Sequence, residues 1–315
     1  MTLDPQVAAF LKSLEKKSGP KSHEVTPEVA RKARSTMQAI PVDMPAVDAH
    51  DRTLPGGPTG EIPVRIVRPR GAIGELPAVM YFHGGGWVVG DKETHFRIVC
   101  EIAAGVGATV VYVDYTRSPE ARYPVAIEQA YAATQWVAQN GRQIGIDPTR
   151  LALFGDSSGG NMAAVVALMA KQRSGPALRA QVLACPVVND DFETGSYHDF
   201  ADGFFMSREL MKWFWNHYAP DVQARKEITA SPLRATVDQL RGLPPTLMIT
   251  ATNDVLRDEG EAYAAKLMEA GVEVTATRYI GTIHAFIMLN PIAQTPATRA
   301  AVGQTNEFLK RKLAR

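Results

Sequence analysis

A serine in a glycine-rich turn is the strongest chemical signal in the sequence. The segment 155–160, GDSSGG, fits the pattern G-x-S-x-G and stands between the apolar run LALF and a helical stretch at 158–173. Small residues two before and two after such a serine allow the strand and the helix to pack closely around a strained turn. Only Ser157 has glycine at both positions, because Ser158 would need a glycine where Asp156 stands. We therefore predict that Ser157 is a nucleophile; a chance match in a glycine-rich loop is the alternative.

A second glycine-rich turn, HGGGW at 83–87, directly follows the apolar run PAVMYF. Acyl transfer requires an oxyanion to be stabilised, and glycine backbone can point several N–H groups at one oxygen, each contributing about 3 kcal/mol. The N–H of Ser158, the residue after the nucleophile, is a further expected donor. A tight structural turn is the alternative, whereas the patterns of phosphate-binding loops are absent. His83 is expected to stiffen this loop by hydrogen bonding.

An acid and a base are expected to follow the serine in the order Ser, acid, His. Asp254 comes just after the apolar run PTLMITA, and His284 comes just after the last expected strand. His284 would take the proton of Ser157 and return it to the leaving alcohol, while Asp254 would orient the imidazole. Asp258 is the rival acid, but its position suits the start of the following helix. The remaining histidines are expected on the surface or in a cap: His23, His50, His95, His198 and His217.

The elements that must position these residues alternate between strands and helices. Apolar runs predict strands at 62–67, 76–82, 108–115, 150–155, 180–186, 245–251 and 272–279, with helices such as 158–173, 259–270 and 293–313. This alternation predicts an α/β fold with a mostly parallel sheet flanked by helices. Ligands in such sheets bind at the carboxyl ends of the strands. Pro63 favours an edge position for the first of these strands.

Two short amphipathic helices are expected ahead of the sheet. The first carries its apolar face on Val7, Phe10, Leu11 and Leu14, and Ser18-Gly19-Pro20 should end it. The second should begin at Thr26-Pro27 and carry Val29, Ala33 and Met37 on one face. Together they predict a lid or cap.

The motifs resemble those of the hormone-sensitive-lipase-like esterases, bacterial family IV of the α/β-hydrolase superfamily. The resemblance runs from the glycine loop to the C-terminus and includes HGGGW and GDSSGG, with DYTRSPE at 114–120 and DVLRDEG at 254–260 similar to further family segments. It implies that Gly85, Gly86 and Ser158 supply the oxyanion-hole N–H groups. The sequence departs from the common family pattern at Thr116, Arg117, Ser118, Val255 and Ser158. These departures bear on substrate preference and leave the three expected catalytic residues intact.

The resemblance also implies a helical cap. Residues 1–50 would form its N-terminal segment, and residues 51–315 the catalytic domain, with a cap insertion at roughly 190–225. The insertion contains the aromatic stretch 204–218, and large aromatic side chains usually serve burial. Four of them, Phe204, Phe205, Trp213 and Phe214, could equally bind substrate. Trp87, beside the glycine loop, is a further candidate. A cap over the site favours short acyl esters over triglycerides.

Composition limits the remaining classes of function. The 315 residues include 34 basic and 33 acidic ones, so a net charge of +1 gives no indication of nucleic acid or an anionic membrane as partner. The N-terminus lacks the pattern of a secretion signal and no apolar stretch is long enough to span a membrane, which favours a cytoplasmic protein. Cys100 and Cys185 lie in apolar segments and are expected to be buried free thiols, with a disulfide as the alternative.

The sequence therefore predicts a serine carboxylesterase that hydrolyses short-chain esters of small molecules through an acyl-enzyme, without a metal or an organic cofactor. An amidase or a specific deacetylase could use the same residues, because one fold and one triad serve several substrates. A non-catalytic ligand-binding protein on this fold is a further alternative, which the presence of His284 disfavours. A homodimer is expected from the family alone.

Overall fold

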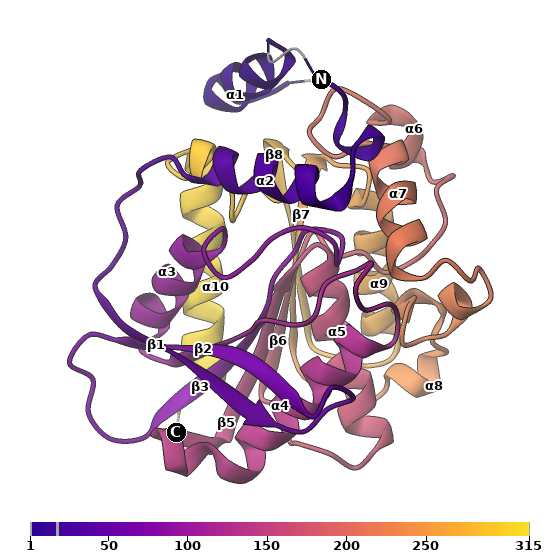
Figure 1. Cartoon of the computed structure of the whole chain (residues 1–315). Coiled ribbons are helices and arrows are strands. Elements are labelled where there is room, and N and C mark those ends of the chain that lie inside the picture. The colour runs from indigo at the N-terminus through magenta and orange to yellow at the C-terminus, as the bar shows by residue number, and fades with distance from the viewer. Residues whose placement is uncertain (1, 17–18, 315) are drawn as a thin grey trace.

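An eight-stranded sheet forms the centre of the protein in a computed structural model that describes residues 2–16 and 19–314 (Figure 1). The strand order is β1-β2-β4-β3-β5-β6-β7-β8; β2 runs antiparallel to both of its neighbours, β1 and β4, and all other neighbouring strands pair in parallel. The strands are β1 (Val47–Pro55), β2 (Glu61–Pro69), β3 (Leu76–Phe82), β4 (Thr109–Val113), β5 (Ile146–Asp156), β6 (Ala180–Ala184), β7 (Thr246–Asn253) and β8 (Val274–Ile283). The predicted α/β fold with a mostly parallel sheet is confirmed, and every strand expected from an apolar run is present.

Helices cover both faces of the sheet, which explains why its central strands are apolar throughout. The helices are α1 (Pro5–Glu15), α2 (Pro27–Gln38), α3 (Phe96–Val106), α4 (Val125–Asn140), α5 (Ser158–Gln172), α6 (Gly195–Asp199), α7 (Arg208–Tyr218), α8 (Val237–Leu240), α9 (Arg257–Glu269) and α10 (Pro296–Lys312). Short 3₁₀ turns lie at Ser22–Glu24, Gly141–Ile144, Ala224–Lys226, Pro232–Arg234 and Asn290–Ile292. Helices α3 and α10 pack on one face, and α4, α5 and α9 on the other, so two hydrophobic cores sandwich the sheet (Figure 1).

The first strand, β1, was not expected from the sequence. Its side chains are mostly exposed and only Leu54 is buried, so the segment lacks the alternation that indicates a half-buried strand. The boundary expected at residue 50 falls inside this strand. Because β1 covers the edge, β2 is not the edge strand that Pro63 suggested. Pro63 is tolerated because the ladder between β2 and β4 begins only at Val64, so its missing N–H removes no hydrogen bond from that ladder.

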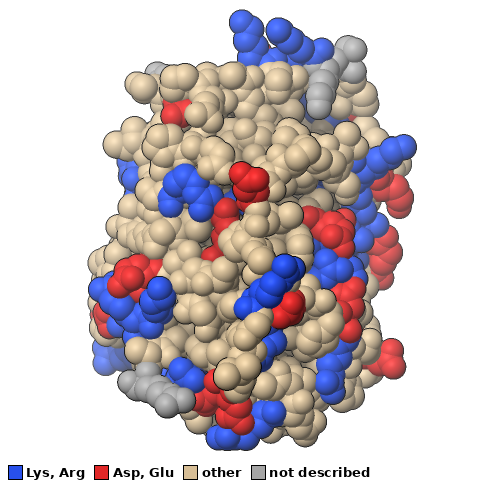
Figure 2. All heavy atoms as spheres, turned by 90° about the vertical axis from the view of Figure 1, so that its left-hand side faces the viewer, with Lys and Arg blue, Asp and Glu red and all other residues tan. Residues whose placement is uncertain are grey.

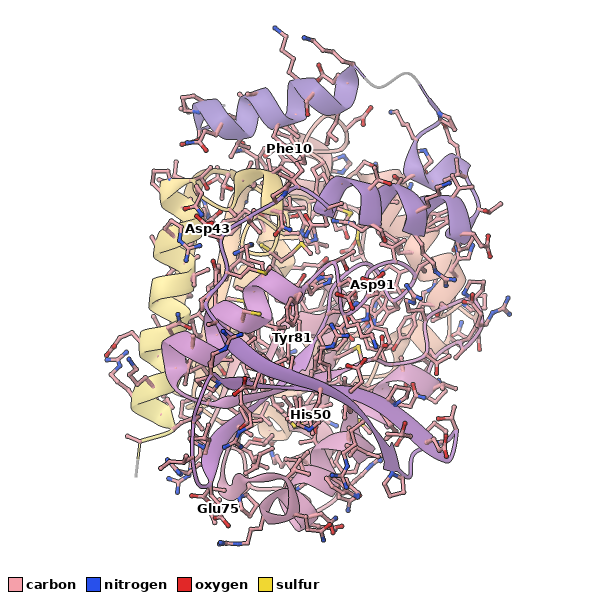
Figure 3. The ribbon with its side chains drawn as sticks, turned by 60° about the vertical axis from the view of Figure 1, so that its left-hand side comes forward. Phe10, Asp43, His50, Glu75, Tyr81 and Asp91 are labelled. Carbon is pink, nitrogen blue, oxygen red and sulfur yellow. The ribbon has the colours of Figure 1, made fainter. Side chains whose placement is uncertain are left out.

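The two segments expected to form a cap contact each other at one end of the molecule, where α1, α2, α6 and α7 lie together (Figure 1). Phe10 lies on the side of α1 that faces the rest of the protein (Figure 3), and its ring centroid is 6.0 Å from that of Phe205. Lys21 Nζ lies 2.6 Å from a carboxylate oxygen of Asp202. The first helix was expected to end at Ser18-Gly19-Pro20, and α1 ends shortly before, at Glu15. Ser18 itself lies outside the described residues.

Helix α2 is fastened to the loops that follow the strands. The guanidinium of Arg31 donates to the carbonyl oxygens of Val88 and Ser118, at 2.8 and 2.9 Å, and binds the carboxylate of Glu120 with two hydrogen bonds of 2.6 and 2.7 Å. At the other end of α2, the Gln38 amide donates to the carbonyl oxygen of Met288 at 3.0 Å. These bonds hold the helix over the carboxyl ends of β3, β4 and β8.

The surface carries mixed charge. Figure 2 shows one face on which basic and acidic side chains alternate without a continuous field of either sign. This agrees with the near-neutral composition and gives no indication of a polyanionic partner on that face. Among the described residues, no helix has the length and apolar character required to cross a bilayer.

The ion pair between Arg31 and Glu120 predicts a definite pH dependence of stability. Hydrogen bonding by Arg31 lowers the pKa of Glu120 to about 2, whereas an unfolded glutamate titrates at about 4.3. The stabilisation is therefore complete above about pH 4.3 and is lost as the pH falls towards 2. We expect Glu120→Gln to lower the melting temperature by a constant amount near neutral pH, and by a shrinking amount below about pH 4.5.

The matched control is the same substitution in an Arg31→Ala background. There Glu120→Gln should change the melting temperature little at any pH, because its partner is gone. A difference that stays constant down to pH 3, or one that survives without Arg31, would contradict this account of how α2 is held.

Candidate active site

The turn between β5 and α5 holds Ser157 in a strained conformation. Its φ of 56° and ψ of −121° lie in a region that non-glycine residues rarely occupy. A Cβ on Gly155 would lie 2.0 Å from the carbonyl oxygen of Gly159, and a Cβ on Gly159 would lie 1.9 Å from that of Phe82. The spacing of the glycines is thus required by the close approach of strand and helix, and the turn presents the Ser157 hydroxyl beyond the end of β5.

Asp254 and His284 meet Ser157 from the ends of two neighbouring strands. His284 Nε2 lies 2.9 Å from Ser157 Oγ, and His284 Nδ1 lies 2.8 Å from Asp254 Oδ2. All three side chains are at most 2% exposed. A neutral imidazole with its proton on Nδ1 satisfies both contacts, since it donates to the carboxylate and accepts from the hydroxyl. The structure brings together the three residues that the sequence singled out.

The rival residues have other contacts. Asp258 accepts a hydrogen bond from the Ser196 N–H at 2.7 Å and one from Arg257 Nε at 2.8 Å, at the start of α9. Ser158 Oγ accepts a hydrogen bond from the Trp87 N–H at 3.2 Å. Asp258 therefore fastens the inserted segment to α9, and the Ser158 hydroxyl links the serine turn to the glycine loop.

Three backbone N–H groups lie in the glycine loop and at the start of the helix that follows Ser157. Gly85 and Gly86 adopt φ values of 115° and 59°, and Ser158 is the first residue of α5. Within the described part of the chain, none of these three amides donates a hydrogen bond. A Cβ on Gly86 would lie 2.0 Å from the ring of Phe214, so no larger residue fits there. Unpaired donors of this kind are what an oxyanion hole requires.

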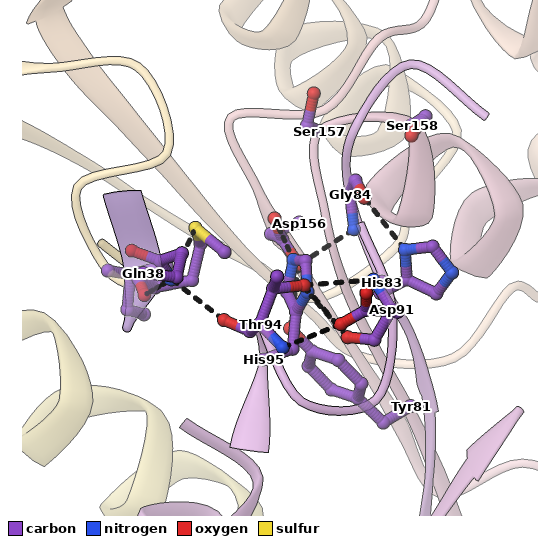
Figure 4. A network of polar contacts seen from close by, with 12 residues as sticks. Gln38, Tyr81, His83, Gly84, Asp91, Thr94, His95, Asp156, Ser157 and Ser158 are labelled. Atoms are coloured by element: carbon purple, nitrogen blue, oxygen red, sulfur yellow. Dashed lines mark hydrogen bonds and ion pairs between the residues drawn. The ribbon is translucent and has the colours of Figure 1, made fainter. Parts of the chain in front are cut away.

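A buried polar network supports the glycine loop from below (Figure 4). Asp156 Oδ1 accepts hydrogen bonds from the Tyr81 hydroxyl at 2.7 Å and from the Gly84 N–H at 3.1 Å, while Oδ2 lies 3.7 Å from His95 Nε2. Burial raises the pKa of Asp156, but His95 and Tyr81 outweigh this effect, so the pKa lies below its usual value. This role was not predicted, although a carboxylate in a turn of otherwise small residues was the available signal. His95, expected on the surface or in a cap, is only 2% exposed here.

His83 stiffens the loop in the expected way. Its Nδ1 donates to the Gly84 carbonyl oxygen at 2.8 Å, and its ring stacks on that of Tyr115 with centroids 4.2 Å apart. Burial, followed by the charge of His95, lowers the pKa of His83 to about 3, so the ring stays neutral and keeps a single donor proton.

Cys185 lies next to Asp254 and His284, and the ligand atoms of the three residues are within 4.8 Å of one another. This spacing could hold a metal ion, but metal binding needs a thiolate. Burial and the charge of Asp254 raise the pKa of Cys185 well above its usual value, which favours the thiol over the thiolate. Asp254 and His284 are already hydrogen-bonded to each other, so a metal ion at this place would have to replace that contact. Cys185 and Cys100 are both buried and free, as predicted.

A cavity of about 930 Å³ lies between α1, α2, α7 and the loop at 202–207. Three of the aromatic side chains expected to bind substrate line it: Phe205, Trp213 and Phe214. The face of α2 predicted from the sequence lines it as well: Val29, Ala33 and Met37. The triad side chains do not border the cavity, but Phe214 both lines it and contacts the backbone at Gly86. Phe214 therefore borders both the cavity and the glycine loop.

Two of the aromatic residues expected to bind substrate do not line this cavity. Trp87 is fully buried, stacked on Tyr218 with centroids 3.9 Å apart, and it does not line the cavity. Phe204 packs edge-on against Phe200 at 5.2 Å and is also absent from the cavity wall. Both side chains support the inserted segment by packing, because each finds an aromatic partner within it.

The fold and the three-residue site define a serine hydrolase of the α/β-hydrolase class. A family model for the alpha/beta hydrolase fold matches residues 79–288, and the chain belongs to this family, as its motifs predicted. A thermostable esterase from Pseudomonas putida is 51% identical, with a TM-score of 0.98 over all of this chain and 98% of that one.

Curated relatives agree with this assignment. The carboxylesterase NlhH of Mycobacterium tuberculosis is 36% identical over 91% of this chain and 89% of its own length. An ethyl acetate hydrolase of Pseudomonas putida is 33% identical over 93% of this chain and 95% of its own length.

Removing the carboxylate beneath the glycine loop tests whether it positions the oxyanion donors. We expect Asp156→Asn to lower kcat about 5- to 30-fold while KM changes less than twofold, because a hydrogen bond of a charged group contributes about 1–2 kcal/mol. Steady-state kinetics with p-nitrophenyl acetate measures both constants. Tyr81→Phe, which removes one donor and keeps the carboxylate, should have a smaller effect. An Asp156→Asn protein with the wild-type kcat would show that the loop does not depend on this residue.

Proposed function

We propose that this carboxylic ester hydrolase cleaves short-chain acyl esters of small molecules, with Ser157 as nucleophile, His284 as base and Asp254 as the orienting acid. The observation that carries the proposal is the chain of contacts from Ser157 Oγ to His284 Nε2 at 2.9 Å and from His284 Nδ1 to Asp254 at 2.8 Å. These are the distances over which a positioned base transfers a proton.

Acylation begins when His284 Nε2 accepts the proton of Ser157 Oγ as this oxygen attacks the ester carbonyl carbon. The carbonyl π electrons move to the oxygen, and the resulting oxyanion accepts hydrogen bonds from the N–H groups of Gly85, Gly86 and Ser158, each worth about 3 kcal/mol. Collapse of the tetrahedral intermediate breaks the bond to the alcohol oxygen, which leaves with the proton held by His284. The Asp254 carboxylate stabilises the imidazolium throughout.

Deacylation repeats the sequence with water as the nucleophile. His284 takes a proton from water, the hydroxide attacks the acyl carbon, and Ser157 leaves with that proton while the carboxylic acid is released. The chain's own groups stabilise every charge that develops in this cycle, on the substrate oxyanion as well as on the imidazolium, so the proposal needs no metal or organic cofactor.

The segments 1–50 and roughly 190–225 act in this proposal as a cap that limits the substrate. The cavity between them is lined by aromatic side chains, among them Phe205, Trp213 and Phe214, together with other apolar and some charged residues. Because Phe214 contacts the glycine loop, only a short acyl or alcohol group can extend past it from Ser157.

An amidase or a specific deacetylase would use the same residues, and no contact described above favours either over an esterase. The hydrogen bond between His284 and Ser157 argues against a non-catalytic binding protein, which has no need of a base at this distance. The cytoplasmic location and the homodimer expected from the sequence stay predictions, which cell fractionation and light scattering would test.

The central experiment measures hydrolysis of p-nitrophenyl esters from acetate to palmitate. We expect the wild type to turn over acetate and butyrate rapidly and palmitate poorly, and Ser157→Ala to lose at least about 10⁴-fold in kcat with an unchanged melting temperature. Ser158→Ala is the matched control; it keeps the backbone N–H and should lose at most about tenfold. Wild-type activity in Ser157→Ala would overturn the proposal.

The position of Phe214 predicts the acyl-chain preference. Phe214→Leu removes part of the ring that lies over Gly86, and each methylene newly accommodated in an apolar site contributes about 0.8 kcal/mol. We expect the ratio of kcat/KM for hexanoate to that for acetate to rise at least about threefold. Phe204→Leu, a similar change outside the cavity wall, should leave this ratio at its wild-type value. Equal ratios in all three proteins would place the limit on chain length elsewhere.

A further inference from the structure

Arg34, on α2, lines the cavity and has no ionic partner among the described residues. Its side chain lines the cavity together with Phe205, and its guanidinium carbon lies 5.0 Å above the centroid of that ring. Among the residues that the structure describes, none hydrogen-bonds to Arg34 or forms a salt bridge with it. Residue 34 is only partly exposed, and burial lowers its pKa to about 10, while the charge of Asp156 opposes this effect.

The other charged residues around the cavity do not neutralise Arg34. Asp202 is paired with Lys21 at 2.6 Å, and Glu15, the second carboxylate in the wall, makes no ion pair with Arg34. Asp156, whose charge acts on Arg34, already accepts hydrogen bonds from Tyr81 and Gly84. Arg31, one turn before on the same helix, shows the contrast, since its guanidinium is fully engaged by Glu120 and two carbonyl oxygens.

Holding a guanidinium in a partly desolvated site without a counter-ion costs free energy. Contact with the Phe205 ring offsets only part of this cost, because a cation–π contact is worth about 0.5–2 kcal/mol. Phe205 itself adopts a φ of 74°, which is strained for an aromatic residue and holds its ring between Phe10 and Arg34. Such an arrangement is stabilised when an anion enters the cavity and pairs with the fork of N–H groups.

We propose that Arg34 is a substrate-binding residue and that the preferred substrates are small esters carrying a carboxylate group. The inference rests on the proposed esterase function and adds the class of ester. The carboxylate would pair with the Arg34 guanidinium while the ester carbonyl reaches Ser157. It can belong to the acyl part, as in half-esters of dicarboxylic acids, or to the alcohol part, as in acylated hydroxy acids. The shared recognition is a carboxylate bound by a planar guanidinium, which favours two parallel hydrogen bonds.

The test compares esters that differ only in charge. For the acyl side the pair is monomethyl succinate and methyl succinamate, and for the alcohol side it is 3-acetoxypropanoate and 3-acetoxypropanamide. Each pair replaces a carboxylate by a carboxamide of nearly the same shape. We expect the wild type to prefer the carboxylate of at least one pair, and the pair concerned identifies which part of the substrate occupies the cavity.

Variants of Arg34 connect this preference to the residue. Arg34→Met should reduce the carboxylate-to-carboxamide ratio of kcat/KM about 10- to 100-fold, mostly through KM, because a hydrogen bond to a charged group is lost. Arg34→Lys keeps the charge but not the fork and should retain part of the preference. Lys32→Met removes an exposed cation of the same helix and should keep the wild-type ratio. Circular dichroism and the melting temperature confirm that each variant folds.

The outcomes separate this inference from the proposed function. Hydrolysis of p-nitrophenyl acetate without a preference for either carboxylate, or a preference that Arg34→Met retains, would overturn the role of Arg34 and leave the esterase intact. If Lys32→Met lost the carboxylate preference to the same extent, the preference would come from the overall positive charge near the cavity, and this result would also overturn the role of Arg34. No hydrolysis of p-nitrophenyl acetate by the folded wild type would overturn the esterase and the substrate class with it.

Discussion

The crossing of β5 and α5 at Ser157 is the constraint on which the rest of the site depends. Helix α5 lies so close to β5 that Gly155 cannot carry a Cβ, and so close to the end of β3 that Gly159 cannot carry one; the turn stores strain at the serine between them. The parallel sheet provides the compensation, because apolar side chains are buried on both of its faces and the Ser157 N–H is bound by the Ala184 carbonyl oxygen at 2.8 Å. A rigid core thus holds one hydroxyl in a position that the local backbone would otherwise avoid.

Electrostatics then follows from burial. The triad and Asp156 are buried, so their hydrogen bonds are stronger than they would be at the surface and their positions are fixed before substrate arrives. The same low exposure makes unpaired polar groups informative. The N–H groups of Gly85, Gly86 and Ser158 have no acceptor among the described residues, which supports the proposed oxyanion hole, and the guanidinium of Arg34, likewise without an ionic partner there, supports the proposed carboxylate site. Phe214 borders both, because it contacts the glycine loop and lines the cavity.

The residues expected to carry the chemistry were easier to predict from the sequence than the strands and aromatic side chains around them. Glycine spacing, strand ends and chain order are local features, so they were enough to find Ser157, Asp254 and His284 and the α/β fold around them. The strand β1 was missed because its exposed residues carry no periodic apolar signal. Pro63 wrongly suggested an edge strand because the sequence of one strand does not show where the ladder with its neighbour begins. Trp87 and Phe205 are both aromatic residues near motifs, yet one is stacked in the core and the other lines the cavity. Which partner an aromatic ring finds depends on tertiary packing, and the same holds for the missing partner of Arg34.

The most direct test of the central claim is to trap the nucleophile. Incubation with diethyl p-nitrophenyl phosphate should transfer one diethylphosphoryl group to the protein and release one equivalent of p-nitrophenolate, and peptide mass spectrometry should locate the group on Ser157. The account predicts a single adduct at that residue, absent in Ser157→Ala and formed much more slowly in His284→Ala. An adduct on Ser158, or equal labelling of the unfolded protein, would contradict a nucleophile activated by the geometry of this turn.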